Sequence, residues 1–426
     1  MDQPTAPIPP HAPRQAGPTP TTSYTSALTA PPPPRLRQHR GRRFGELTAV
    51  GLLSAALATG GTWGVISLTD QSPTSTSAGT SAGTTHTADA ASVVPVSSAS
   101  KTNPDWNAVT AAVSPSVVAI TVRSGDSGGE GSGVVIDKSG HILTNHHVVS
   151  GAGTDAKITV TLANGNTYVA TVAGEDASTD LAVVTITDPP KDLTPITVGS
   201  SSGLQVGDPV MAVGNPLGLA GTVTTGIVSA LNRPVTTSST ESQQQDPFAQ
   251  QDSSSPVVTS AIQTSAAVNP GNSGGALVDA AGRLVGINSS IASLGSSSGQ
   301  SGSIGIGFAI PVDEAQWIAE QLIQDGSAEH AFLGVTPRDG TASQGSATRS
   351  GAEIESVSSG SAAAKAGLRT GDLVVGINDT PVTSAEALVG LIHAQRIDSS
   401  ADLAVIRDGK EQTIQVTLGT APSAQG

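Results

Sequence analysis

The sequence contains no cysteine, and both aromatic residues (2%) and charged residues (13%) are scarce. Without cysteine, a disulfide scaffold, a thiol nucleophile and a Cys-ligated zinc or iron–sulfur site are excluded. The low charge content excludes a coiled coil and a highly charged disordered chain. The net charge of −14 argues against nucleic acid as a partner. A length of 426 residues predicts two or three folded units.

Positive charge is concentrated in residues 1–46, which carry six arginines and two acids for a net charge of +4, whereas the remaining residues carry −18. The 22-residue run Leu47–Leu68 follows and contains no charged residue. At about 1.5 Å per residue, such a helix crosses a hydrocarbon core of about 30 Å. By the positive-inside rule, residues 47–69 are predicted to form a single transmembrane signal anchor, with a cytoplasmic N-terminus and an extracytoplasmic remainder.

A cleaved signal peptide is the alternative for this run. The clearest small-x-small cleavage site, Ala88–Ala90, lies about 20 residues beyond the run. Such a site normally follows the apolar segment closely, so the anchor is favoured, while cleavage remains an open alternative.

Composition divides the rest of the chain. Residues 1–46 are predicted to be a disordered, Pro-rich cytoplasmic tail. Residues 70–104 are rich in Ser and Thr and cannot bury enough surface to offset the entropy of ordering, so a flexible linker is predicted. Folded domains are predicted over 105–328 and 329–420, followed by a tail over 421–426.

Closely spaced β-branched runs predict an all-β region. Lys157–Leu162 and Thr167–Val172 flank Asn164-Gly165, a strong hairpin signal. A further run begins at Gly133, and about a dozen strands in all favour antiparallel barrels or a sandwich. The first long helical period is Val312–Gln324. Its apolar face comprises Ala315, Ile318, Ala319 and Leu322.

The segment Gly271-Asn272-Ser273-Gly274-Gly275 is the first candidate for chemistry. Glycines beside a serine allow a tight turn and let backbone N–H groups face a developing oxyanion. The same segment matches the nucleophile elbow of α/β-hydrolases, and a Gly-Ser turn without function is the plainer alternative. An elbow requires strand–turn–helix, with Asp and then His downstream. Here Ala276–Ile287 has a strand–turn–strand pattern, which excludes the elbow.

If Ser273 is a nucleophile, the alternative is a general base upstream of it, although each upstream histidine taken alone favours a structural or solvent-facing role. Three histidines precede it in the predicted folded region: His141, His146 and His147. His147 follows the end of an apolar strand. Asp180 directly precedes the apolar strand Leu181–Val184 and is therefore better placed to be buried and fixed than Asp176, which has polar neighbours. The order His, Asp, Ser is that of chymotrypsin-like proteases.

The segments in this region resemble the HtrA/Deg family of serine proteases, and the resemblance extends over residues 105–420. The matching segments are Thr144–Val149, Asp180–Val183, Gly214–Gly218, Thr225–Ala230, Gly271–Leu277 and Gly305–Pro311. The resemblance implies a double antiparallel β-barrel and identifies His147, not His146, as the base beside Asp180 and Ser273. It also implies an oxyanion hole formed by the backbone N–H groups of Gly271 and Ser273, with Asn272 near by, and no cofactor or metal.

The resemblance also bears on specificity and regulation. Ala267 and Ile291 are expected to line the S1 pocket, so small aliphatic P1 residues are favoured and Arg is disfavoured. Ser265 stands where the family commonly has Asp. We interpret this difference as a change in the loops that support or activate the site, without loss of the triad. The alternative is a pseudoenzyme. The Ser/Gln/Thr-rich insert 233–256 occupies the place of a sensor loop, so we expect a resting state switched by ligand, with an unstructured surface loop as the plainer interpretation.

A smaller α+β domain is expected at the C-terminus. Phe332-Leu333-Gly334-Val335 resembles the carboxylate-binding loop of PDZ domains, and Glu386–His393 is predicted to be a helix. A PDZ fold binds a C-terminal peptide as an added strand. The family further implies a homotrimer and misfolded or specific protein substrates. A PDZ adaptor or chaperone with little proteolysis is the competing function.

Overall fold

The computed structural model describes residues 102–125, 127–150, 156–216, 221–237, 257–290 and 305–421. The chain divides into two units, 1–85 and 86–426, and all described residues belong to the second. The predicted tail 1–46, the apolar run 47–69, most of the linker, residues 238–256, Ile291 and residues 422–426 lie outside them. Within the described ranges, no helix is long and apolar enough to cross a membrane.

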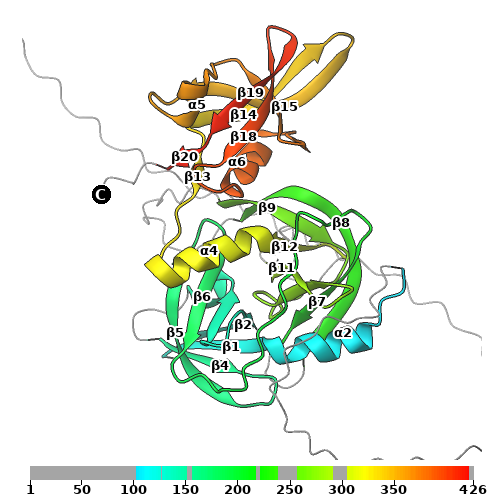
Figure 1. Ribbon diagram of the computed structural model, residues 1–426, viewed down its shortest axis with the longest axis vertical. Coiled ribbons are helices and arrows are strands. Elements are labelled where there is room, and N and C mark those ends of the chain that lie inside the picture. Colours follow the sequence, from blue (N-terminus) through cyan, green and yellow to red (C-terminus); the bar gives the residue numbers. More distant parts are fainter. Residues whose placement is uncertain are drawn as a thin grey trace, which may run out of the picture. The chain divides into compact units, whose positions relative to one another are not determined.

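Two closed six-stranded barrels form the first part of the described chain (Figure 1). The first barrel has the strand order β1-β2-β3-β6-β5-β4, and the second has the order β10-β11-β12-β9-β8-β7. The strands of the first are β1 (Val117–Ser124), β2 (Ser127–Val135), β3 (His141–Thr144), β4 (Lys157–Thr161), β5 (Thr167–Asp176) and β6 (Leu181–Ile186). The strands of the second are β7 (Pro209–Gly214), β8 (Thr222–Thr237), β9 (Val257–Thr264), β10 (Ala276–Asp279), β11 (Leu284–Ser289) and β12 (Gly307–Pro311). Neighbouring strands within each barrel pair antiparallel, which confirms the predicted barrel class.

The Asn-Gly hairpin is confirmed. Strands β4 and β5 pair antiparallel with Thr161 opposite Thr167. Gly165 in the connecting turn has a φ of +84°, a left-handed conformation that glycine adopts without a Cβ penalty.

The predicted start of the second strand was wrong. It was placed at Gly133, whereas β2 begins at Ser127 and pairs with β1 along its whole length. The glycines of this segment look like turn residues in the sequence. Gly131 is nevertheless required in the strand, because a Cβ there would lie 2.6 Å from a methyl group of Val148.

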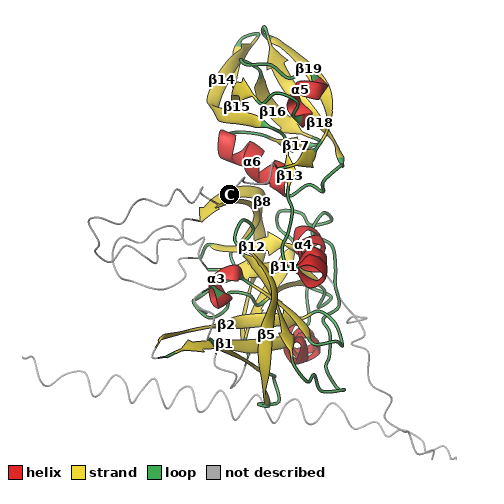
Figure 2. Cartoon of the chain, turned by 90° about the vertical axis from the view of Figure 1, so that its left-hand side faces the viewer, coloured by secondary structure: helices red, strands yellow, loops and turns green. Residues whose placement is uncertain are grey.

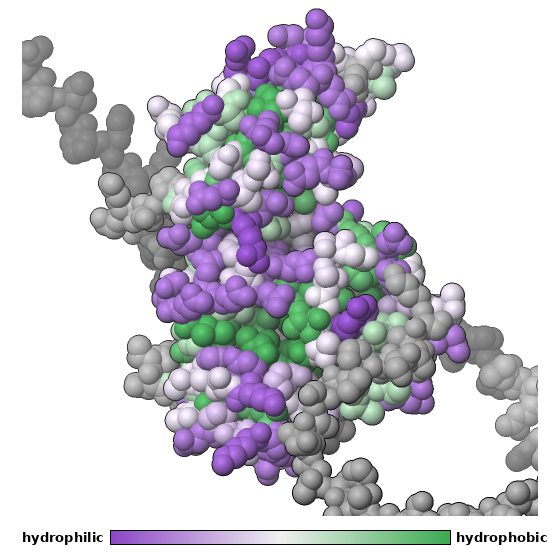
Figure 3. Space-filling view, viewed as in Figure 1, coloured by the Kyte–Doolittle hydropathy of each residue, from purple (hydrophilic) through white to green (hydrophobic). Residues whose placement is uncertain are grey.

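Separate apolar cores fill the two barrels, and a third cluster joins strands of both barrels to two helices, α2 (Trp106–Val113) and α4 (Val312–Asp325). The short helix η1 (Ser114–Ser116) follows α2. The predicted helix at 312–324 is confirmed, and its expected apolar face is buried. It ends at Gly326, whose φ of +77° gives a left-handed C-cap. Figure 3 shows hydrophobic residues gathered in a band on the visible face of the barrels.

An α+β unit follows, as predicted. Its main sheet has the order β14-β15-β16-β18-β19, with β17 paired to β16, and β13 pairs separately with β20. The strands are β13 (Ala331–Phe332), β14 (Val335–Gln344), β15 (Ala347–Val357), β16 (Leu373–Ile377), β17 (Thr380–Pro381), β18 (Ser400–Arg407), β19 (Lys410–Thr417) and β20 (Gly419–Thr420). Helices α5 (Ala362–Ala366) and α6 (Ala385–His393) accompany them, so the predicted second helix is confirmed (Figure 2).

Candidate active site

One residue, Asn145, separates β3 from the short helix α3 (His146–Val149), which presents two adjacent histidines. Its position is fixed by the carbonyl of Asp180, which accepts hydrogen bonds from Asn145 Nδ2 (2.9 Å) and from the His146 backbone N–H (3.0 Å). Asp180 itself directly precedes β6 and has a φ of +58°, unusual for a residue other than glycine. The two segments are therefore also joined through the Asp180 carbonyl, by one backbone donor and one side-chain donor.

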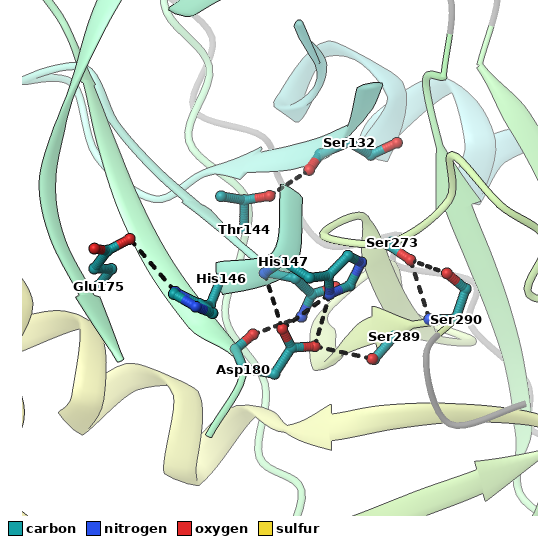
Figure 4. A network of polar contacts seen from close by, with 10 residues as sticks. Ser132, Thr144, His146, His147, Glu175, Asp180, Ser273, Ser289 and Ser290 are labelled. Atoms are coloured by element: carbon teal, nitrogen blue, oxygen red, sulfur yellow. Dashed lines mark hydrogen bonds and ion pairs between the residues drawn. The ribbon is translucent and has the colours of Figure 1, made fainter. Parts of the chain in front are cut away.

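The side chains of His147 and Asp180 form the central contact of the site (Figure 4). His147 Nδ1 lies 2.9 Å and 3.0 Å from the two carboxylate oxygens of Asp180. The carboxylate is buried and also accepts hydrogen bonds from the His147 backbone N–H (3.1 Å) and from Ser289 Oγ (3.1 Å). A carboxylate facing Nδ1 favours the tautomer with its proton there, which leaves Nε2 able to accept a proton.

His146 is oriented differently from His147. Its Nδ1 lies 3.4 Å from Glu175 Oε2 and makes no hydrogen bond to a described residue. His141 pairs with Asp137 at 2.6 Å. Of the three candidate histidines, only His147 has its side chain in contact with the Asp180 carboxylate.

Ser273 comes from the second barrel, in the loop that precedes β10. Its Oγ contacts the hydroxyl of Ser290 and accepts a hydrogen bond from the Ser290 backbone N–H (3.0 Å). No hydrogen bond between the described residues joins Ser273 to His147. Catalytic hydrogen bonds are often long in the absence of substrate and tighten when it binds. Figure 4 shows the His147 ring with Asp180 on one side and Ser273 on the other.

The loop around Ser273 has the backbone conformation that its glycines permit. Gly271 has a φ of +91° and Gly274 a φ of +79°. The N–H groups of Gly271 and Ser273 donate no hydrogen bond to a described residue. Asn272 is buried and closes the turn, since its N–H donates to Asn269 and its carbonyl accepts from Gly275, each at 3.0 Å.

The residues expected to set specificity are only partly described. Ala267 is half-buried, and its carbonyl accepts a hydrogen bond from Thr224 Oγ1 (2.8 Å). Ile291 lies outside the described residues. Ser265, the departure from the family pattern, pairs with both backbone groups of Ile227: its Oγ accepts from the N–H and its own N–H donates to the carbonyl, each at 3.1 Å.

The predicted peptide-binding loop connects β13 to β14. Gly334 has a φ of +80°, and a Cβ there would lie 2.2 Å from Ser361 Cβ. The carbonyl of Leu333 accepts from the N–H of Ala363 (2.9 Å), and that of Gly334 accepts from the N–H of Ser358 (2.9 Å). The loop is thus held against the start of α5, while Phe332 ends β13 and Val335 begins β14.

Asp176, which its polar chain neighbours made a weaker candidate than Asp180 for a buried and fixed carboxylate, is also buried and fixed. This carboxylate is buried and accepts hydrogen bonds from the N–H (3.1 Å) and Oγ (2.6 Å) of Ser178 and from Thr179 Oγ1. His330 Nε2 lies 3.0 Å from the same carboxylate and 2.7 Å from Ser178 Oγ. Burial pushes the pKa of Asp176 upward, but the hydrogen bonds and charge of His330, with the two hydroxyls, outweigh it and hold the pKa below its ordinary value. These contacts brace the loop that ends at Asp180.

Glu314 on α4 is a second buried acid near this loop. Its side chain is 4% exposed, and its Oε2 has no hydrogen-bond partner among the described residues. Burial, followed by the negative charge of Asp176, raises the pKa of Glu314 to about 8. The folded protein therefore keeps this carboxyl protonated at neutral pH.

Replacing Glu314 by glutamine is expected to flatten the dependence of stability on pH. In the parent, the unfolded chain loses this proton near the ordinary glutamate pKa of 4.5, whereas the folded protein keeps it up to about pH 8. The Glu314 contribution to the free energy of unfolding therefore falls as pH rises across this window, by about 1.4 kcal/mol per unit of pKa difference. Denaturant midpoints of unfolding, determined at pH 5 and pH 8.5 for the parent and for Glu314→Gln, measure this change in stability.

Glu320→Gln is the matched control, because Glu320 is exposed on the same helix. It should leave the parent's pH dependence unchanged. If the free energy of unfolding fell as steeply with pH in Glu314→Gln as in the parent, the raised pKa of Glu314 would be contradicted.

The comparisons with known proteins agree with this geometry. The chain matches the trypsin-like peptidase domain over residues 131–287 and the PDZ domain over residues 331–418. Serine protease PepD of Mycobacterium tuberculosis is 41% identical over 406 residues, which cover 92% of this chain and 82% of PepD. Periplasmic pH-dependent serine endoprotease DegQ of Escherichia coli is 38% identical over 301 residues, which cover 70% of this chain but only 60% of DegQ.

Among solved structures, the HtrA-type protease AlgW with a bound tripeptide has a TM-score of 0.54 and 31% sequence identity. The match covers 76% of this chain and 99% of the AlgW chain. A Chlamydia muridarum DegP-like endoprotease is 40% identical over 300 residues, and this chain spans 55% of its length.

Proposed function

Because this chain belongs to the HtrA family of serine proteases, we propose that it is a membrane-anchored, extracytoplasmic endopeptidase that cleaves misfolded or specific proteins. The observation that supports the catalytic part most directly is the contact of His147 Nδ1 with the buried Asp180 carboxylate, beside Ser273. In this proposal Ser273 attacks the peptide carbonyl, His147 transfers the proton, and Asp180 holds the imidazole.

The developing oxyanion would be stabilised by the backbone N–H groups of Gly271 and Ser273, which have no other acceptor among the described residues. Preorganised donors of this kind cost no reorganisation when charge develops in the transition state. The chemistry requires no cofactor or metal, since nucleophile, base and oxyanion donors all come from the chain.

The remaining parts of the proposal concern recruitment and assembly. The PDZ domain would bind C-terminal peptides through the loop Phe332–Val335, for recruitment or activation. Residues 47–69 would anchor the protein in the membrane, with the catalytic domain outside the cytoplasm. We also propose a homotrimer; exposed apolar side chains on β8, such as Val223 (39%) and Ile227 (46%), offer surface for self-association.

Degradation of unfolded casein by the full-length protein, purified from membranes, tests the proposed function. Cleavage should occur and should stop after treatment with a serine-directed fluorophosphonate. Casein that is kept soluble but not cut would instead favour the competing function, a PDZ chaperone or adaptor.

A further inference from the structure

Ser132 lies in β2 of the first barrel with none of its surface exposed, yet its hydrogen bonds reach the second barrel. Its hydroxyl donates to the carbonyl of Gly271 (2.6 Å) and accepts from the backbone N–H of Asn215 (2.8 Å). Its backbone N–H donates to the carbonyl of Ser273 (2.8 Å). One buried residue of the first barrel therefore contacts two backbone carbonyls of the nucleophile loop.

The same residue is also tied to the segment that carries the base. The carbonyl of Ser132 accepts a hydrogen bond from Thr144 Oγ1 (2.7 Å), at the end of the strand that leads to His147 (Figure 4). The base and Asp180 come from the first barrel, whereas Ser273 comes from the second. Ser132 thus connects the two halves of the site. The approach is close, because a Cβ on Gly274 would lie 2.1 Å from the Ser132 carbonyl oxygen.

The contact with Gly271 bears on the oxyanion hole. A peptide unit is planar, so holding the Gly271 carbonyl fixes the plane that joins Gly271 to Asn272. This plane lies between the two N–H groups proposed to bind the oxyanion, those of Gly271 and Ser273. Glycine with a φ of +91° has the freedom to rotate. A fixed hydrogen bond to its carbonyl removes that freedom.

We propose that Ser132 is a positioning residue that aligns the oxyanion hole and the nucleophile loop with the His147–Asp180 pair. The proposal rests on the proposed peptide hydrolysis by Ser273. It goes beyond the triad, because Ser132 touches neither substrate nor the reacting atoms and acts through the backbone of Gly271 and Ser273.

The test compares Ser132→Ala with Ser116→Ala in the full-length protein. Ser116 is also a fully buried serine, but its hydroxyl has no hydrogen-bond partner among the described residues. For Ser132→Ala we expect kcat on a peptide substrate to fall roughly 10- to 100-fold at constant KM, less than the loss of an oxyanion donor itself. Binding of a peptide boronate, which mimics the tetrahedral state, should weaken by a similar factor. Binding of the cleaved product peptide should not change.

Each outcome decides the proposal. A kcat for Ser132→Ala equal to that of Ser116→Ala overturns it, and so does a lower melting temperature with unchanged kcat, which would assign Ser132 a purely structural role. If the parent cleaves no peptide, the proposed function has failed, and amide hydrogen exchange then tests Ser132 separately. Faster exchange over residues 271–273 in Ser132→Ala supports positioning, and unchanged exchange contradicts it.

Discussion

Replacing Ser273 by alanine is expected to reduce kcat for peptide cleavage by about 10⁶-fold, the scale seen when a triad nucleophile is removed. The variant loses the hydroxyl proposed to attack the substrate, while the backbone of the loop is held by contacts that the substitution leaves intact. Among these are the hydrogen bonds of the Ser273 carbonyl with Ser132 (2.8 Å) and of the Gly274 N–H with Asn288 (2.9 Å). The fold and the affinity for product peptides should therefore be unchanged.

Steady-state cleavage of a fluorogenic peptide with a small aliphatic P1 residue measures this effect. Ser139→Ala, an exposed substitution in the turn after β2, serves as the control and should match the parent. Activity within tenfold of the parent in Ser273→Ala would mean that another nucleophile performs the cleavage.

Replacing Asp180 by asparagine is expected to lower kcat by about 10⁴-fold with little change in KM. The Asp180 carboxylate oxygens lie 2.9 Å and 3.0 Å from His147 Nδ1, which favours the tautomer with its proton on Nδ1. An asparagine amide can present a donor at this position and so favour the tautomer with its proton on Nε2, which cannot take a proton from Ser273. The hydrogen bond from the His147 backbone N–H can persist, because asparagine keeps one acceptor oxygen.

Asp188→Asn is the matched control for this substitution, since Asp188 is exposed beyond the end of β6. It should leave kcat and KM at the parent values. A decrease in kcat/KM of Asp180→Asn that came only from a raised KM would indicate that Asp180 acts in substrate binding and not in orienting the base.

Local features of the sequence favoured an antiparallel barrel or sandwich and singled out Asp180, whereas the double barrel and the choice of His147 over His146 came from the resemblance to the HtrA/Deg family. The Asn164-Gly165 hairpin, the alternating runs and the helix at 312–324 were predictable because each depends on residues close together in the chain. Asp180 was identified by its place directly before a buried apolar strand, a position that tends to fix a side chain.

The supporting contacts were not predictable, because they join distant segments. The hydroxyl of Ser132 meets Gly271 across 139 positions, and Ser178 meets His330 across 152 positions. Neither pair has a local signature. Asp176 was misjudged for the same reason: its chain neighbours are polar, but His330 and the packing of the fold bury it.

The most direct test of the proposed mechanism is to map the site at which a fluorophosphonate reacts with the full-length protein, by peptide mass spectrometry. We predict a single covalent adduct, on Ser273, which forms much more slowly in His147→Ala and in Asp180→Asn. A stable adduct on another serine, or labelling of Ser273 at an equal rate in all three proteins, would contradict a Ser273 nucleophile activated by the His147–Asp180 pair.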